Sequence, residues 1–175
     1  MKKILALLTG LFFALTGCAS QKIEEYKAVT PKMDIREYLN GESEAWGVLF
    51  DLSGKQDVHF HVTMKGTWKG NDGKLAEQFV FNDGRKDERV WTIKVIDDNN
   101  FTATAADVVG TAIGTQHGNA VNMKYVLRVP RDGSTIDLDM DDWMYRIDEK
   151  TVLNRTEMRK FGIKVGELMI LFRKK

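Results

Sequence analysis

Several side chains that can exchange protons or bind a polar group stand at alternate positions among apolar residues. Asp142 follows Leu138 and Met140 at a spacing of two, and Arg146 continues the same series. Successive residues of a β-strand point to opposite faces, so residues two apart share a face. The series therefore places a carboxylate and a guanidinium on the apolar face of a strand, where an unpaired charge is costly.

The same alternation predicts further polar groups on the inner face of the fold. Glu77 shares a face with Phe79 and Phe81, and Arg89 shares one with Trp91. His117 and Asn119 extend the face of Val121, Met123 and Tyr125. We take as candidate ligand-binding residues Trp91, His117, Asn119, Tyr125, Met140, Asp142 and Arg146.

Two interpretations of these inward polar groups stay open. In the first, they form a structural network in which Arg146 and Arg89 pair with Asp142 and Glu77 and close one end of the fold. In the second, they form the polar end of a cavity that binds the headgroup of a ligand beneath apolar walls. The chain has 8 methionines, whose flexible side chains suit an adaptable pocket as well as ordinary packing.

Other combinations of reactive residues predict no catalytic, metal or cofactor site. His59 and His61 share a face, but they alternate with Phe60 and Val62, so they point outward, and two ligands are too few for a metal. Asp141 and Asp142 are neighbours on a strand and point to opposite faces. The sequence also contains no nucleophile elbow, Walker loop or dinucleotide fingerprint.

The elements that position these groups are short strands in series. Period-two alternation of apolar residues, typical of half-buried strands, covers residues 58–68, 89–97, 121–129 and 136–144. Turn signals such as Asn82-Asp83-Gly84 separate the runs. We predict an all-β fold, an antiparallel up-and-down β-barrel of about nine or ten strands, with a short N-terminal helix over 34–39. Closing the meander into a barrel removes exposed strand edges.

The only cysteine, Cys18, follows a basic and then apolar N-terminus. Lys2 and Lys3 precede an apolar run that ends near Leu15. This run has the length of a secretory signal and is too short to span a bilayer. The Leu-Thr-Gly-Cys sequence resembles the bacterial lipoprotein cleavage site. That resemblance implies cleavage before Cys18, a lipid on its sulfur and, since Ala and Ser follow, the periplasmic face of the outer membrane.

The chain is accordingly divided into three parts. Residues 1–17 are predicted to be a signal peptide, residues 18–33 a lipidated tether and residues 34–175 the barrel. The 26 basic and 25 acidic side chains nearly balance, and two of the basic ones lie in the leader. We therefore expect no nucleic-acid partner, since that needs a basic patch.

Further sequence features resemble a known family. They run in order from Asp34-Ile35-Arg36-Glu37-Tyr38-Leu39-Asn40-Gly41 through Ala106-Asp107-Val108-Val109-Gly110 and Asp141-Asp142-Trp143-Met144-Tyr145 to Lys160-Phe161-Gly162. In order and spacing they resemble the proteobacterial lipoproteins catalogued as domain of unknown function 3833. Genes of that family often lie beside genes for modification of membrane fatty acids, which implies a lipid-related role. A short helix followed by Gly41 and Trp46 also resembles the start of a lipocalin barrel.

Three hypotheses for function follow. The first is a barrel, anchored by lipid on Cys18, that binds inside it a small apolar or amphipathic ligand such as a fatty acid or lipid. The second is a packed barrel that docks another envelope protein through an exposed Trp143 and Tyr145, which lie opposite the Leu138 face. The third is an enzyme acting on lipid tails, with Asp142 or His117 as acid or base.

Overall fold

A computed structural model describes residues 21–131 and 133–175 of the chain and shows an almost entirely β structure. Ten strands follow two short helical turns: η1 Ile23–Tyr26, α1 Ile35–Tyr38, β1 Gly41–Phe50, β2 Gln56–Lys69, β3 Asp72–Phe81, β4 Lys86–Val95, β5 Asn100–Thr104, β6 Val108–His117, β7 Ala120–Arg131, β8 Ser134–Arg146, β9 Thr151–Lys160 and β10 Ile163–Lys174. No helix in these ranges is long and apolar enough to cross a membrane.

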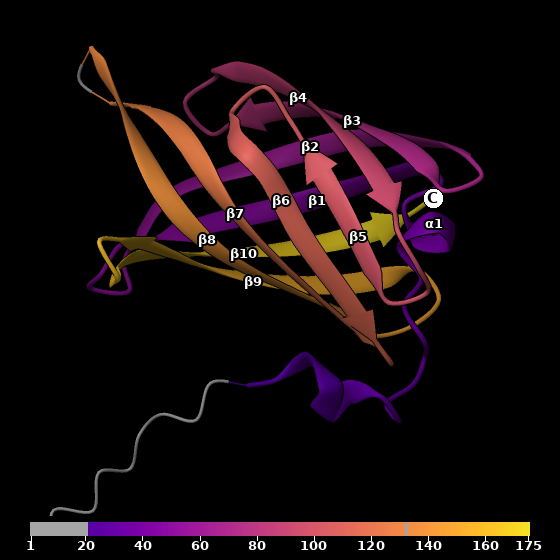
Figure 1. Cartoon of the computed structure of the whole chain (residues 1–175). Helices are drawn as coiled ribbons and strands as arrows, with labels where there is room; N and C mark the ends of the chain where they lie inside the picture. The colour runs from indigo at the N-terminus through magenta and orange to yellow at the C-terminus, as the bar shows by residue number, and fades with distance from the viewer. Residues whose placement is uncertain (1–20, 132) are drawn as a thin grey trace, which may run out of the picture.

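The strands close into a single barrel in sequence order (Figure 1). Each strand pairs antiparallel with its neighbours, and β1 closes the ring with β10, for example through Trp46 opposite Leu171. Burial alternates as the sequence predicts: Phe60, Val62 and Met64 of β2 are buried, whereas the residues between them are not. The predicted up-and-down barrel and its number of strands are therefore confirmed.

One end of the barrel is plugged by the chain that precedes β1. Asp34 caps α1 by accepting a hydrogen bond from the Arg36 N–H at 2.9 Å, and Met33, Ile35 and Tyr38 are each at most 2% exposed. Gly66 of β2 has no Cβ, which lets the carbonyl of Leu39 pack directly against it. The predicted short helix is confirmed, and it serves as a plug.

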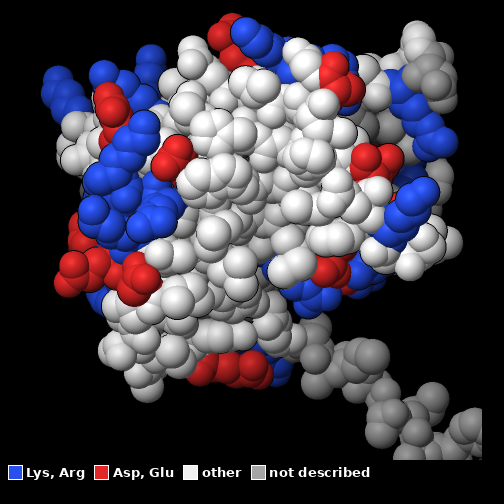
Figure 2. Space-filling view, turned by 180° about the vertical axis from the view of Figure 1, so that it is seen from behind, with Lys and Arg blue, Asp and Glu red and all other residues white. Residues whose placement is uncertain are grey.

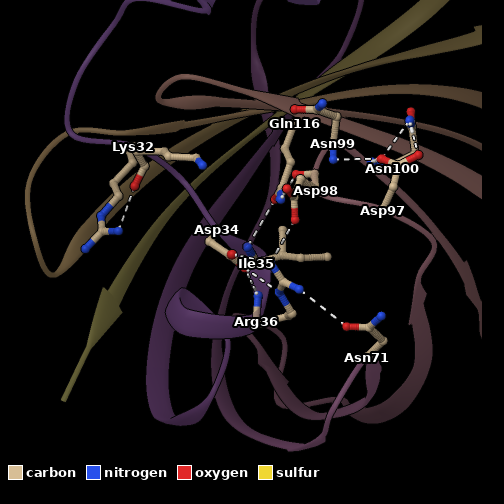
Figure 3. A network of polar contacts seen from close by, with 11 residues as sticks. Lys32, Asp34, Ile35, Arg36, Asn71, Asp97, Asp98, Asn99, Asn100 and Gln116 are labelled. Atoms are coloured by element: carbon tan, nitrogen blue, oxygen red, sulfur yellow. Dashed lines mark hydrogen bonds and ion pairs between the residues drawn. The ribbon is translucent and has the colours of Figure 1, made fainter.

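Polar contacts fix this plug to the closed end (Figure 3). The side chain of Gln116 is buried and accepts from the Ile35 N–H at 3.2 Å, while its amide donates to the Asp98 carbonyl at 2.9 Å. Arg36 donates to Asp34 at 2.7 Å and to Asn71 at 3.3 Å. The two hydrogen bonds of Gln116 join the plug to the loop between β4 and β5.

The opposite end of the barrel, which we call the open end, is less completely buried. Phe81, Leu127 and Ile136 face inward close to the turns at this end, and each is only partly buried. Val121 and Val152, which face inward near the plug, are fully buried. Figure 1 shows α1 at one end and the hairpin of β7 and β8 projecting at the other. The interior is thus fully buried near the plug and less completely buried toward the other end.

The N-terminal segment packs on the outer wall rather than only connecting to it. Tyr26 of η1 lies 5.9 Å from Trp143 and 5.6 Å from Tyr145, measured between ring centroids. Trp143 is consequently 7% exposed, and the prediction that Trp143 presents an exposed docking surface is wrong. The sequence pattern of β8 places Trp143 on the outer face correctly, but it does not show that η1 covers it. Cys18 lies outside the described residues.

Candidate functional site

The inward polar residues of the central strands gather at the boundary between the sealed and open halves. Glu77 of β3, Arg89 of β4, Tyr125 of β7 and Asp142 of β8 contribute to this group, which we call the interior cluster. Glu77 and Asp142 are each 9% exposed. Strand alternation therefore predicts their inward orientation correctly.

Arg89 is the cation of the interior cluster. It stands opposite Glu77 in the β3–β4 pair, with Nη1 3.8 Å from a Glu77 carboxylate oxygen. Its Nη2 and Nε donate to Asp107, in the loop before β6, at 2.6 and 2.9 Å. The guanidinium also lies 5.6 Å from the ring centroids of Phe79 and Trp91. These contacts fix the orientation of Arg89, and its hydrogen bonds go to Asp107.

Glu77 is less well satisfied than Arg89. Its Oε2 atom is buried and has no hydrogen-bond partner among the described residues. Burial raises the pKa of Glu77 to about 7, although the nearby Arg89 opposes that rise. A buried oxygen without a partner destabilises the fold, so a hydrogen-bond donor that reached Glu77 would be stabilised there.

Asp142 has partners from two other strands. It accepts hydrogen bonds from the Asn154 amide of β9 and from the Tyr125 hydroxyl, the latter at 3.4 Å. Burial raises the pKa of Asp142 to about 6, and these hydrogen bonds oppose the rise. Burial and the neighbouring Asp142 raise the pKa of Tyr125 well above its ordinary value. The cluster thus contains two carboxyl groups that titrate near neutral pH.

The predicted ion pairs are confirmed for Glu77 and Arg89 but not for Asp142 and Arg146. Arg146 lies at the closed end and donates to the Lys32 carbonyl at 2.8 Å and to Glu37 at 3.3 Å. Four residues along a strand span about 13 Å, so a shared face does not bring these two side chains together. Asp107 and Asn154 are partners that strand alternation did not identify, although Asn154 follows Val152 at the spacing of an inward residue.

The other candidate ligand-binding residues divide between the cluster and the closed end. Trp91 meets Tyr125 edge-on at 5.5 Å, and Met140, opposite Tyr125 on the next strand, is buried. Asn119 instead donates to the Arg146 carbonyl at 3.1 Å in the turn before β7. Trp91, Tyr125 and Met140 therefore belong with the interior cluster, whereas Asn119 does not.

The predicted inward orientation of His117 is wrong. Gln116 takes the buried position at the end of β6, so His117 follows the outward side of that strand. The turn at Gly118 and Asn119 separates β6 from β7. The alternation of β7 therefore cannot be extended back through the turn to His117.

The charge of the interior cluster is unbalanced. Glu77, Asp107 and Asp142 stand against the single guanidinium of Arg89, and Arg89 is already bonded to Asp107. Such a site favours a group that donates hydrogen bonds. Within the described ranges, no three His, Cys, Asp or Glu side chains are grouped to hold a metal.

Two open depressions lie on the barrel wall, and the second of them borders Tyr125 and Met140. One, of about 540 Å³, is bordered by residues of β2, β3 and β4 that include His61 and Lys86. The other, of about 530 Å³, is bordered by residues of β6 to β9 that include Lys124 and Arg159. Neither depression reaches Glu77 or Arg89.

Comparisons with known proteins identify a family and a fold. A family model described as "Protein of unknown function (DUF3833)" matches residues 12–174. A search among curated proteins returned no significant match. Rv2717c from M. tuberculosis is similar in structure, with a TM-score of 0.59 and 13% identity over 84% of this chain and 99% of that one. The S-type phycobiliprotein lyase CPES from Guillardia theta has a TM-score of 0.54 and 8% identity over 89% and 99%. At these identities the likeness shows the barrel fold alone.

Proposed function

The chain belongs to the DUF3833 family, and we propose that its barrel binds a small amphipathic ligand, a lipid, in the open half. The polar group of the ligand lies against the interior cluster, and its apolar chain lies along the partly exposed inner wall. The observation that carries the proposal is the buried Oε2 atom of Glu77, which accepts no hydrogen bond from any described residue and has the Arg89 guanidinium 3.8 Å away. It lies in a barrel whose inward residues are only partly buried toward one end.

The apolar part of the site is aromatic. The rings of Phe60, Phe79 and Phe81 pack against one another with centroids 5.6 to 6.2 Å apart. Phe79 and Phe81 remain partly exposed although they face inward. Covering an exposed apolar side chain with a lipid chain contributes about 25 cal/mol per Å² removed from water. These rings therefore supply a binding surface for an alkyl chain.

The polar part of the site selects among headgroups. A fatty acid carboxylate would face Glu77, Asp107 and Asp142, and the only nearby guanidinium already bonds to Asp107. A hydroxyl or amine, by contrast, can donate a hydrogen bond to Glu77. We therefore favour a lipid with a donating polar group over the ionised fatty acid that the sequence analysis names.

The proposed location of the protein follows from its N-terminus. We propose that the chain is cleaved before Cys18, carries lipid on that cysteine and is held at the periplasmic face of the outer membrane. The support is the sequence pattern around Cys18. Several acyl chains on one residue give far firmer attachment than a single chain.

The geometry supports the docking and enzyme hypotheses less well than it supports ligand binding. Docking through Trp143 would require Tyr26 to leave its ring contact with that residue. For the enzyme, His117 follows the outer side of β6 and is not an interior acid or base, which leaves Asp142 as the remaining candidate.

A titration with three ligands of equal chain length tests the proposal. Purified protein is titrated with dodecylamine, dodecanol and dodecanoate below their critical micelle concentrations, and binding is measured by calorimetry. We expect the amine and the alcohol to bind more tightly than dodecanoate, and Glu77→Gln to weaken amine binding. Glu88→Gln, next to Arg89 but exposed, is the matched control. No binding of any ligand, or equal effects of both variants, contradicts the proposal.

A further inference from the structure

Apolar and aromatic side chains form a continuous row across the outer wall of four neighbouring strands. Trp46 of β1 stands opposite Leu171 of β10, Leu171 stands opposite Leu153 of β9, and Leu153 stands opposite Tyr145 of β8. One step along the strands, Val48 stands opposite Met169. Directly opposed residues in neighbouring strands are close enough to touch. We call Trp46, Val48, Tyr145, Leu153, Met169 and Leu171 the outer apolar face.

This face remains accessible in the structure. Trp46 is 43% exposed, Leu171 42% and Met169 36%. Figure 2, seen from behind the view of Figure 1, shows a broad uncharged surface bordered by charged side chains. The bordering charges include Glu44, which contacts His61 beside Trp46. A contiguous apolar surface with a polar rim is typical of a site that contacts a membrane or another protein.

The segment that precedes β1 contacts one edge of the outer apolar face through Gln21 and Tyr26. The Gln21 amide donates to the Tyr145 hydroxyl at 2.8 Å, and the Tyr26 hydroxyl donates to Gln21 at 3.0 Å. The rings of Trp143 and Tyr145 are stacked at 6.1 Å and lie under Tyr26. The position of Gln21 relative to the barrel is therefore fixed by contacts with this edge.

The length of chain before Gln21 limits where a lipid on Cys18 could be. Cys18 lies three positions before Gln21, and three extended residues span about 10 Å. Acyl chains on Cys18 would therefore enter a bilayer close to Tyr145, beside the outer apolar face rather than at the open end of the barrel.

We infer that the outer apolar face docks on the surface of the lipid bilayer in which the Cys18 lipid is inserted. This inference rests on the lipid anchor that forms part of the proposed function. Trp and Tyr, which Trp46 and Tyr145 supply here, are enriched where proteins meet the headgroup region. The axis of the barrel then runs parallel to the membrane surface, and its open end lies beside that surface.

A bilayer fits this face better than a second copy of the chain does. The anchor tethers the face within reach of lipid at all times, so even a modest apolar area adds to attachment. Some exposed apolar residues elsewhere on the strands are isolated. Ile113 on β6, for example, is 58% exposed but stands between Lys124 and Thr102 on the adjacent strands.

Quenching of tryptophan fluorescence by brominated lipid tests the inference. The processed full chain is reconstituted in vesicles of phosphatidylethanolamine and phosphatidylglycerol with bromine near the headgroup end of the acyl chains. We expect quenched emission, loss of that quenching in Trp46→Phe, and retention of it in the control Trp68→Phe. We also expect Leu171→Lys to reduce the quenching and Ile113→Lys to leave it unchanged, with thermal melting confirming that both variants fold.

The outcomes separate docking from the proposals on which it depends. A vesicle-bound, acylated protein whose Trp46 is not quenched overturns the docking inference and leaves the anchor intact. Dimerisation in detergent that is lost in Leu171→Lys, together with unquenched Trp46, assigns the face to a second copy instead. A mass spectrum with no acylated Cys18 peptide overturns both anchor and docking. Ligand binding in the barrel is measured separately by the dodecylamine titration.

Discussion

The side chains that hold the plug and those of the interior cluster differ in how completely they are hydrogen bonded, although Asn119 Oδ1 near the closed end also accepts no hydrogen bond from a described residue. At the closed end, Gln116 and Arg146 are buried and each has several hydrogen-bond partners. Midway toward the other end, Glu77 is also buried, but within the described part of the chain its Oε2 atom accepts no hydrogen bond and has only the Arg89 guanidinium 3.8 Å away. Its neighbouring carboxyl, Asp142, has a pKa raised to about 6.

The polar contacts of the plug therefore contribute to the stability of the fold, whereas in our proposal the interior cluster contributes to ligand binding. Buried polar groups with partners hold the plug in one position, because removing a partner leaves a desolvated group uncompensated. An unsatisfied carboxyl group beside partly exposed rings lowers stability in the empty barrel, and it is where a ligand gains most. The following predictions change one end at a time.

The largest effect on stability is expected from Gly66→Ala at the closed end. The added Cβ would overlap the Leu39 carbonyl oxygen, a backbone atom that cannot rotate away. We expect a loss of about 3 kcal/mol in the free energy of unfolding, as for overpacked cores, measured by urea denaturation. Thr67→Ala, at the adjacent exposed position, should change it by less than about 0.5 kcal/mol. Equal effects would show that the plug does not pack against β2.

Glu77→Gln is expected to change the pH dependence of stability. The pKa of Glu77 rises from 4.5 to about 7 on folding, so between these pH values the folded chain retains a proton that the unfolded chain has lost. Stability therefore falls as pH rises through this window, by up to about 3 kcal/mol. Glu77→Gln should remove that fall.

Denaturation at pH 4, 5, 6, 7 and 8 measures this effect of Glu77. Asp142→Asn is the informative companion, because the pKa of Asp142 rises from 3.8 to about 6. Asp142→Asn should remove a fall in the free energy of unfolding that occurs at lower pH than the fall caused by Glu77. A Glu77→Gln curve parallel to that of the wild type would mean that Glu77 is solvated.

Gln116→Leu is expected to loosen the plug by a smaller amount. The substitution keeps the volume roughly constant but leaves the Ile35 N–H and the Asp98 carbonyl without this partner. We expect a loss of about 2 kcal/mol and faster amide hydrogen exchange at Ile35. Ligand affinity should be unchanged, since Gln116 lies at the closed end. Altered dodecylamine affinity would mean that the two ends are coupled.

Phe81→Ala is expected to have the smallest effect on stability and a clear effect on binding. A fully buried phenylalanine costs about 3–5 kcal/mol when truncated, and Phe81 is partly exposed, so its cost should be well below that range. Dodecylamine affinity should fall, measured by calorimetry. A large loss of stability with unchanged affinity would reverse the roles assigned to the two ends.

Much of the fold and part of the site could be predicted from the sequence because both depend on local alternation. The period of two fixes which side of each strand Glu77, Arg89 and Asp142 occupy. Contacts set by loops and neighbouring strands could not be predicted. The pairing of Arg89 with Asp107 needs the β5–β6 loop, and the cover over Trp143 needs the path of η1.

Methyl NMR on methionine-labelled protein tests most directly whether ligand binds in the open half. Met140 and Met158 oppose each other on β8 and β9 and follow the inward side of their strands, whereas Met33 lies in the plug and Met169 on the outer wall. We predict nuclear Overhauser effects from the dodecylamine chain to Met140 and Met158, and none to Met33 or Met169. Effects confined to Met169, or found at no methionine of a saturated complex, would contradict binding inside the barrel.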